Sequence, residues 1–394
     1  MTSLARKSRH VVIIGAGVIG ASIAYHLSLR GIDVTVLEAV SPAAGASGAS
    51  DGAISVITKS PGPLMQLGVH GKAYYNELAC PGGILQGAFH QRSAFIAASC
   101  ESEIKVIEKQ AAALEQVGIF CNMLEGSALH KVFPQLSNDV PMVMEVGNEG
   151  YAIGYEIVDR FLRASGAKVR RNCPVVSIEY DLDSGRCTGV RTADHVIHAD
   201  DVVLAAGLSS AHLEPRIEML PQRGQLIVAD RSDSFRHFPG HLFFASYLAS
   251  KGNAAADGSF QQHSRRNGAL VIDPLRTGQL LIGSTREPGD DASYADFESI
   301  QRILKTAVSY LPKIAEIDVL RVFAGVRAVM IDGTPLLGPI GAAPGLWVAT
   351  GFAGDGISLA PLVGRELGKL MTGETALNEI EVMSPSRIAR LRPH

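Results

Sequence analysis

The first apolar stretch of the chain, residues 11–14, leads directly into the glycine motif GAGVIG, which begins at Gly15. A helical pattern follows over residues 21–29. Gly15 permits a tight turn after a strand, Gly17 has no Cβ to block a pyrophosphate, and Gly20 lets the helix pack closely on the sheet. The N-terminus of that helix offers N–H groups and the positive end of its dipole to phosphates. The motif therefore predicts a dinucleotide-binding turn.

Glu38 closes the next apolar stretch, residues 34–37, and completes the length of one βαβ unit. A carboxylate at this place accepts a hydrogen bond from a ribose 2′-OH and repels the 2′-phosphate of NADP. The motif therefore favours FAD or NAD, and it leaves the choice between them open. An empty Rossmann-like turn is the alternative, which the complete order of strand, turn, helix and acid disfavours.

Length and composition describe a globular protein without a nucleic-acid signature. At 394 residues the chain is long enough for two domains, and 46% hydrophobic against 19% charged residues is typical of a packed core. The net charge of −3 gives no electrostatic case for binding nucleic acid or an anionic membrane. No apolar stretch is long enough for a transmembrane segment, and the start lacks the pattern of a signal peptide.

The cysteines indicate a reducing compartment. Their number, five, is odd, and none shows CxxC spacing. Free thiols therefore fit better than a disulfide or zinc framework, and we expect a cytoplasmic protein without a bound metal.

The remaining pattern predicts two interleaved domains. Small residues at 45–52 allow close backbone approach to a ligand and can bind phosphate, with a flexible linker as the alternative. The apolar runs at 201–207 and 346–351 are typical of parallel strands buried on both faces. We assign residues 10–82, 146–220 and 325–375 to a cofactor domain, and residues 83–145 and 221–324 to a substrate domain.

Five ordered motifs make the chain similar to the D-amino-acid-oxidase-like family of FAD enzymes. They are the N-terminal fingerprint, residues 221–225, residues 283–287, residues 325–327 with 332–335 and 338–339, and residues 351–361. That family includes glycine and sarcosine oxidases, D-amino-acid dehydrogenases, and catalytic subunits of opine, hydroxyproline and cyanide-forming dehydrogenases. The resemblance covers almost the whole chain. It implies an α/β fold in which a Rossmann-like FAD-binding domain is interleaved with a substrate domain built on a mainly antiparallel sheet.

The motifs and the resemblance together predict the residues that hold FAD. They are Gly15, Gly17, Val18, Ile19, Gly20, Glu38, Ala39, Ala46, Ser47, Ala49, Ser50, Val175, Val176, Ala206, Gly207, Arg327, Gly354, Asp355, Gly356 and Ile357. The last helix is expected to aim its N-terminus at the flavin pyrimidine ring, where negative charge develops on reduction. An ordinary strand-to-helix turn is the alternative for that glycine-rich stretch.

Arg327 is the predicted catalytic residue. It is the only charge in the apolar run 324–330, and a charge so placed usually pairs with something. In the family, the arginine of this motif clamps the substrate carboxylate, and a guanidinium fork matches a carboxylate with two hydrogen bonds. The alternative is an ordinary ion pair at the surface.

Five features depart from the family pattern. Val271 stands where the glycine-type oxidases have a tyrosine. Sarcosine-oxidase-like members of the family attach flavin through a cysteine near the region of Arg327, whereas the nearest cysteine here is Cys187, so the resemblance implies that FAD is held non-covalently. Asp355, if ionised, would work against the helix dipole. The helix expected at residues 159–164 is shorter than in relatives, and residues 58–63 resemble the heteromeric dehydrogenase subunits more than the self-sufficient oxidases.

Other polar residues have ordinary expectations. His90, His241 and His263 have no evident partner in the sequence, so each is expected to be structural. Tyr247 lies in a polar stretch, residues 246–260, that is predicted to be a loop near a pocket, and a structural role is favoured for it as well.

The resemblance implies FAD-dependent oxidation of an amino acid or N-substituted amino acid, by hydride transfer from the α-carbon to flavin N5, which leaves an imine. The expected partner is a small amine or amino-acid substrate. Three alternatives stay open: a dehydrogenase subunit that passes electrons to partner subunits or another acceptor rather than to oxygen, an NAD-dependent dehydrogenase, and a flavoprotein with a purely structural role in a complex.

Overall fold

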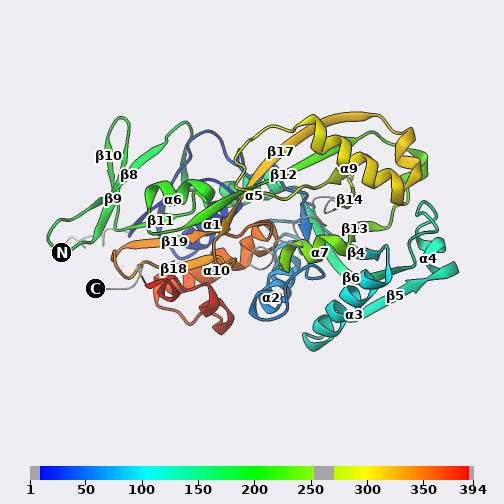
Figure 1. Cartoon of the computed structure of the whole chain (residues 1–394). Helices are drawn as coiled ribbons and strands as arrows, with labels where there is room; N and C mark the ends of the chain where they lie inside the picture. Colours follow the sequence, from blue (N-terminus) through cyan, green and yellow to red (C-terminus); the bar gives the residue numbers. More distant parts are fainter. Residues whose placement is uncertain (1–8, 253–269, 390–394) are drawn as a thin grey trace.

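The computed structural model describes residues 9–252 and 270–389, and His263 lies outside this part of the chain. Two large sheets lie side by side in it, with helices around both (Figure 1). No helix in the described part is long and apolar enough to cross a membrane.

A mainly parallel sheet contains the N-terminal motif. Its strand order is β18 (Leu336–Pro339), β19 (Leu346–Thr350), β11 (Asp201–Leu204), β1 (His10–Ile14), β2 (Asp33–Leu37) and β7 (Lys168–Arg170). Every neighbouring pair is parallel except β18 with β19. The sheet is thus Rossmann-like, and β1, β11 and β19 come from three distant parts of the sequence.

Side chains of β1 explain why this sheet is covered on both faces. Val11 and Ile13 pack into a core with helices α1 (Val18–Ser28), α2 (Pro63–Leu78), α5 (Gly154–Ser165) and α10 (Gly356–Thr372). Val12 and Ile14 point the other way, into a core shared with the antiparallel strands β8 (Val175–Tyr180), β9 (Cys187–Thr192) and β10 (Val196–His198). Alternation of side chains along one fully apolar strand therefore supplies both cores.

The second sheet is mainly antiparallel. Its order is β16 (Glu287–Pro288), β12 (Met219–Ala229), β15 (Leu280–Gly283), β14 (Val271–Pro274), β13 (Gly240–Phe244), β4 (Phe89–Ala98), β6 (Met142–Ala152) and β3 (Ala53–Ile54), while β17 (Val319–Met330) pairs with β12 and β5 (Cys121–Glu125) with β6. Of these pairs, β13 with β4 is parallel. The fold class expected from the sequence is confirmed.

The remaining described elements connect and cover the sheets. They are α3 (Glu101–Gln116), α4 (Gly126–Val132), α6 (Ser210–Leu213), α7 (Ala245–Gly252), α9 (Phe297–Tyr310), and the 3-10 turns η1 (Gly207–Ser209), η2 (Asp233–Phe235), η3 (Pro312–Glu316), η4 (Asn378–Met383) and η5 (Pro385–Arg387). The domain boundaries stay a prediction, and β17 crosses the one placed at residue 325.

Two local expectations were wrong. Helix α5 spans Gly154–Ser165 rather than the short stretch 159–164, because its apolar side packs against α1 and outweighs the weak helix propensity of its first residues. The stretch beginning at residue 246 is not a loop at its start, since α7 covers Ala245–Gly252. The rest of that stretch, residues 253–260, lies outside the described residues.

Candidate cofactor and substrate site

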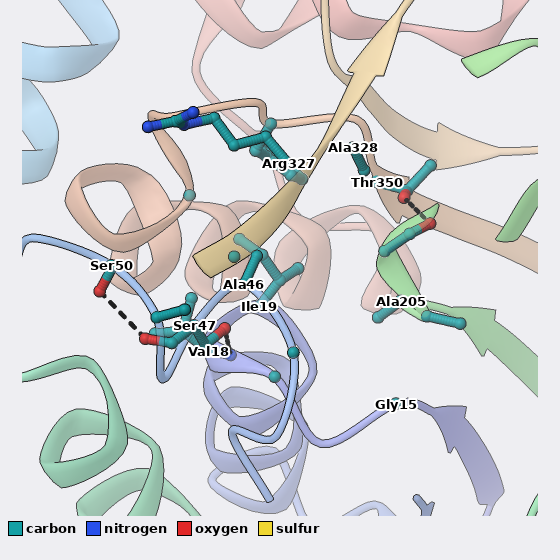
Figure 2. A pocket seen from close by; sticks show the side chains of 18 of the residues that line it. Gly15, Val18, Ile19, Ala46, Ser47, Ser50, Ala205, Arg327, Ala328 and Thr350 are labelled. Carbon is teal, nitrogen blue, oxygen red and sulfur yellow. Dashed lines mark hydrogen bonds between the residues drawn. The ribbon is translucent and has the colours of Figure 1, made fainter. Parts of the chain in front are cut away.

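A cavity of about 680 Å³ extends from the carboxyl ends of β1 and β2 to the antiparallel sheet. Figure 2 shows Gly15 and Arg327 at separate places on its wall. Parallel sheets bind their ligands outside the carboxyl ends of the strands, as here. The predicted cofactor residues all line this cavity, with Gly20 as the exception, and their individual roles toward FAD stay predictions.

The three glycines of the N-terminal motif act differently. Gly15 has φ of +103°, and a Cβ there would lie 2.5 Å from the carbonyl oxygen of Ala205. Gly17 precedes α1 with extended backbone, φ −73° and ψ 179°, and leaves space beside the cavity. A Cβ on Gly20 would collide with the carbonyl oxygen of Gly15, so this glycine serves the packing of α1 against the turn.

Glu38 and Ser47 organise the cavity wall near α1. The Glu38 carboxylate accepts hydrogen bonds from the N–H groups of Ala16 at 2.8 Å and Val40 at 2.9 Å. The Ser47 hydroxyl accepts from the N–H of Val18 at 3.0 Å, which satisfies one donor of the first helical turn (Figure 2). The small residues predicted to wrap a phosphate thus lie against the helix start.

Lys59 is a cavity residue that the sequence alone did not single out. Its side chain is 3% exposed, and its ammonium lies 2.6 Å from Oδ1 of Asp355 and 2.6 Å from the hydroxyl of Ser358. Asp355 immediately precedes α10, so the carboxylate expected to oppose the helix dipole has a cationic partner. The position of Lys59 at the end of the largely apolar stretch 53–58 could have marked it as a candidate site residue. Its partner, Asp355, is 296 residues away in the sequence, so their pairing was not predictable.

Arg327 extends from β17 over Gly224 of β12, where any Cβ would collide with the guanidinium. Its Nη1 donates to the carbonyl oxygen of Thr285 at 3.2 Å, and its Nη2 lies 3.4 Å from the hydroxyl of Ser284. Within the described residues no carboxylate lies within 4.0 Å of the guanidinium. Burial and the nearby charge of Arg286 lower the pKa of Arg327, which still leaves it cationic at neutral pH.

Arg286 and Tyr247 lie beside this arginine. The guanidinium carbon of Arg286 lies 4.6 Å from the centroid of the Tyr247 ring, and Tyr247 itself lines the cavity. Tyr247 lines the cavity, as its expected place near a pocket suggested, and the structural role favoured for it stays a prediction. Arg286 stands inside the motif at residues 283–287, but no local pattern indicated a role for it.

Two other residues considered in the sequence lie away from the cavity wall. Val271 is buried in the core of the antiparallel sheet, and His241 is buried 3.4 Å from Asp273. All five cysteines are free, and Cys173 lines the cavity near Glu38. Within residues 9–252 and 270–389, no group of three or more His, Cys, Asp or Glu side chains is placed to hold a metal ion.

The cavity fits FAD by its chemistry. Gly17 carries no Cβ beside the space where a pyrophosphate would lie, α1 presents its N-terminus, and the Glu38 carboxylate lines the cavity with the chemistry that a ribose hydroxyl requires. At the other side of the cavity, Gly356 opens α10, whose N-terminus suits a ring that gains negative charge. One ligand with a phosphate group in its middle and a reducible ring matches both features.

Comparison with known proteins gives the same result. The glycine oxidase of Bacillus licheniformis is 25% identical over 97% of this chain and 98% of its own length. The match to the glycine oxidase of Pseudomonas putida is 29% identical, but it spans only 54% of this chain and 52% of that protein. The hydrogen cyanide synthase subunit HcnC of Pseudomonas aeruginosa is 25% identical over 98% of this chain and 97% of its own.

A solved structure shares the fold. The crystal structure of glycine oxidase from Geobacillus kaustophilus covers 96% of this chain and 98% of its own, with a TM-score of 0.83 and 22% identity. The family model described as FAD dependent oxidoreductase, DAO, matches residues 10–370. FAD is therefore the cofactor, the NAD alternative is removed, and the chain belongs to the DAO family of FAD-dependent oxidoreductases.

Proposed function

We propose that this protein oxidises an amino acid or an N-substituted amino acid, and that Arg327 binds the α-carboxylate of the substrate. The observation that carries the proposal is a guanidinium that lines the cofactor cavity and has no carboxylate partner within the described residues. Relatives over nearly the full length of the chain are named glycine oxidase, which supports an amino acid as substrate.

The chain contributes orientation. Arg327 is fixed by the Thr285 carbonyl and by its position above Gly224, so its remaining donors have a defined direction. A bidentate grip on the carboxylate leaves rotation about one axis, and the walls of the cavity limit that rotation, which brings the α C–H toward the cofactor. FAD held by these residues would supply the hydride acceptor, and the substrate, having lost its α-hydride, would become an imine that water hydrolyses.

The α10 N-terminus supplies positive potential. Backbone N–H groups at Gly356 and Ile357 begin the helix beside the cavity, and Lys59 balances the carboxylate that precedes them. Such fixed dipoles stabilise charge that develops during reduction without further rearrangement.

The test compares Arg327→Ala with Arg321→Ala, an exposed arginine on the same strand. With glycine, sarcosine and both enantiomers of alanine and proline as substrates, we expect Arg327→Ala to raise KM about 100-fold while flavin stays bound. Arg321→Ala should leave KM within a factor of two of the wild type. Equal kinetics for the two variants would refute the clamp, and no flavin reduction by any amine in the wild type would refute the proposed function.

A second candidate is a catalytic subunit that passes electrons to a partner. Residues 58–63 favour it, since they resemble the heteromeric dehydrogenase subunits and place Thr58 and Lys59 on the cavity wall, and a full-length relative is named as a subunit. Peroxide formation by the purified chain, measured against reduction of an artificial dye, separates the two. Rapid dye reduction with negligible peroxide favours the subunit, and stoichiometric peroxide favours the oxidase.

A further inference from the structure

Among the described residues, Asp51 is the one cavity-lining acid that is neither paired with a cation nor bound by two backbone N–H groups. The other two such acids have partners: Glu38 accepts two backbone N–H groups, and Asp355 is paired with Lys59. Asp51 accepts the N–H of Ala53 on its Oδ1 at 3.3 Å, and its carboxylate forms no ion pair in the described part of the chain. A carboxylate so placed can accept further hydrogen bonds from a ligand.

The segment before Asp51 lies beside the guanidinium of Arg327. Gly224 and Gly325 are opposite each other on strands β12 and β17. The guanidinium covers Gly224, while Ala49 covers Gly325, where a Cβ would lie 2.5 Å from the methyl carbon of Ala49. Side chains of opposite residues on paired strands lie about 5 Å apart. Ala49 is therefore a neighbour of the guanidinium, and Asp51 follows it within about 7 Å of chain.

The backbone on both sides of Asp51 is held by contacts with other parts of the chain. The Ser50 hydroxyl donates to the carbonyl oxygen of Ser47 at 3.0 Å (Figure 2). The N–H of Ala152 in β6 donates to the carbonyl oxygen of Gly52 at 3.0 Å. The Asp51 carboxylate therefore starts from a fixed position, which a group that orients a substrate requires.

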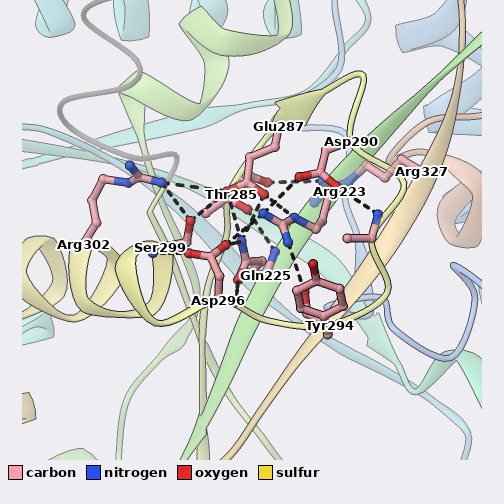
Figure 3. A network of polar contacts seen from close by, with 11 residues as sticks. Arg223, Gln225, Thr285, Glu287, Asp290, Tyr294, Asp296, Ser299, Arg302 and Arg327 are labelled. Carbon is pink, nitrogen blue, oxygen red and sulfur yellow. Dashed lines mark hydrogen bonds and ion pairs between the residues drawn. The ribbon is translucent and has the colours of Figure 1, made fainter.

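Figure 3 shows Arg327 at the edge of a network whose acids are bound to another arginine. Nη2 of Arg223 lies 3.0 Å from Asp290 and 2.8 Å from Asp296. Its Nε lies 2.5 Å from Glu287. These three acids therefore have a cation of their own, and they leave Arg327 without a carboxylate partner in the described part of the chain.

Arg327 and Asp51 are thus opposite charges on the wall of one cavity, and no ion pair joins them among the described residues. Burial and the charge of Arg286 lower the pKa of Arg327. Tyr247 and the charge of Asp51 act in the opposite direction, so Asp51 and Arg327 interact across the space between them. A zwitterionic amino acid carries the complementary charges, a carboxylate for the guanidinium and an ammonium for Asp51. A carboxylic acid without the amine would instead place a second negative charge before Asp51.

We propose that Asp51 binds the ammonium group of the substrate, and that Arg327 and Asp51 together select the zwitterionic form of an amino acid. The inference rests on the proposed function for the carboxylate at Arg327 and adds a second binding residue. Two fixed points define the direction of the substrate in the cavity, which one guanidinium alone does not. Primary and secondary amines both carry N–H donors as cations, so the selection applies to amino acids and to N-substituted amino acids.

The experiment compares two ligands that have the same shape and differ only in the amine. 2-Aminoisobutyrate carries an ammonium where pivalate carries a methyl group, and neither compound has an α-hydrogen available for oxidation. Each is titrated calorimetrically into the flavin-loaded protein. In the wild type we expect 2-aminoisobutyrate to bind about 10- to 100-fold more tightly than pivalate.

Asp51→Asn keeps the size of the side chain and removes its charge. This variant should bind 2-aminoisobutyrate about 10-fold or more weakly than the wild type does, and pivalate more tightly, because the repulsion of the anion is removed as well. A variant that failed to fold would lose both ligands, so opposite shifts identify the charge itself. Asp194→Asn changes an exposed acid between β9 and β10 and should leave both affinities unchanged.

Arg327→Ala separates this inference from the proposed function. It should weaken both ligands by a similar factor and leave their ratio near the wild-type value, because the two compounds share the carboxylate. Unchanged binding of both ligands in Arg327→Ala contradicts the proposed function, whereas the ratio between the ligands still tests Asp51. A ratio that survives Asp51→Asn overturns the inference.

A smaller pair of ligands serves a cavity too narrow for a quaternary carbon. Glycine and propionate again differ by an ammonium and a methyl group, and they are titrated into protein whose flavin has been reduced beforehand, so that no glycine is consumed. A preference for glycine that is lost in Asp51→Asn supports the inference. The absence of a preference in both pairs overturns it, and so does an Asp51→Asn protein that retains FAD less well but keeps the wild-type ratio, since the carboxylate would then bind the cofactor.

Discussion

The ammonium of Lys59 lies 2.6 Å from the carboxylate of Asp355, and this pair joins the segment after β3 to the residue that starts α10. Both residues line the cavity, so the contact connects two walls of the cofactor site. Lys59 also holds the hydroxyl of Ser358 in the first turn of the helix. The ion pair thereby fixes where the positive end of α10 points.

The Lys59–Asp355 pair predicts a shift in flavin potential. In Lys59→Met the carboxylate stays near the proposed flavin position without its counterion, which disfavours the reduced, more negative flavin. We expect the two-electron potential to fall by about 30 mV, equivalent to about 1.4 kcal/mol. Spectroelectrochemistry measures it. The double variant Lys59→Met with Asp355→Asn should restore most of the lost potential. A potential that stays low in the double variant would mean that the charge of Asp355 does not cause the shift.

The motif glycines predict two different failures. Gly17→Ala has permissible backbone angles and places its Cβ 3.2 Å from the Ser47 hydroxyl, beside the cavity. We expect a folded protein whose FAD affinity falls about 10-fold or more, measured by flavin retention during dialysis. Gly20→Ala collides with the Gly15 carbonyl and should instead lower the melting temperature of the apoprotein. The exposed Gly147→Ala, which meets nothing within 4 Å, is the control.

His26 predicts a loss of stability in mild acid. Its Nδ1–H donates to the carbonyl of Ser22 at 2.8 Å and its Nε2 accepts from the hydroxyl of Tyr74 at 2.8 Å. Both nitrogens of the neutral imidazole ring therefore have a hydrogen-bond partner. Burial lowers the pKa of His26 from 6.5 to about 4. Because the unfolded chain binds this proton more readily, the contribution is complete above pH 6.5 and is lost as the pH falls toward 4.

The size of this effect is measurable by urea unfolding. Between pH 7 and pH 5 the His26 contribution to the free energy of unfolding should fall by about 2 kcal/mol. In His26→Gln the stability is lower at both pH values, but the pH-dependent part should shrink by that amount. Parallel pH profiles for the wild type and the variant would show that His26 does not carry the proton.

The Arg223 network predicts unequal roles for two neighbouring arginines. Arg223→Gln removes the cation shared by Glu287, Asp290 and Asp296, and we expect a loss of about 2 kcal/mol in stability. Arg302→Gln removes a looser, partly exposed contact and should cost less than about 0.5 kcal/mol. Thermal unfolding of the two variants checks the difference, and similar losses would contradict the assignment.

Features carried by consecutive residues were readable from the sequence. The strand, glycine turn and helix at the N-terminus follow local rules, and strands β11 and β19 lie within the apolar runs 201–207 and 346–351. Pairings across the chain were not readable. Neither Lys59 with Asp355 nor Arg286 with Tyr247 leaves a local signal, because each pair meets only after both sheets have formed.

The start of helix α5 also could not be predicted from local sequence. Its first residues, Gly154 and Tyr155, are weak helix formers, so the pattern placed the start too late. In the structure the ring centroids of Phe161 and of Tyr25 in α1 lie 5.6 Å apart. This contact belongs to a core whose residues come from distant parts of the sequence, so a short stretch of sequence does not reveal it. Packing therefore extends the helix beyond what its own sequence supports.

The strand order of the parallel sheet has a consequence for how the protein is made. The N-terminal motif leaves the ribosome first, yet β1 needs β11 as its neighbour, β11 needs β19, and α1 packs against α10. The last two of these partners, β19 and α10, are translated only when residues 346–372 are made. We therefore expect flavin loading to follow the synthesis of β19 and α10, and a ribosome-stalled chain that ends before β19 should emerge colourless.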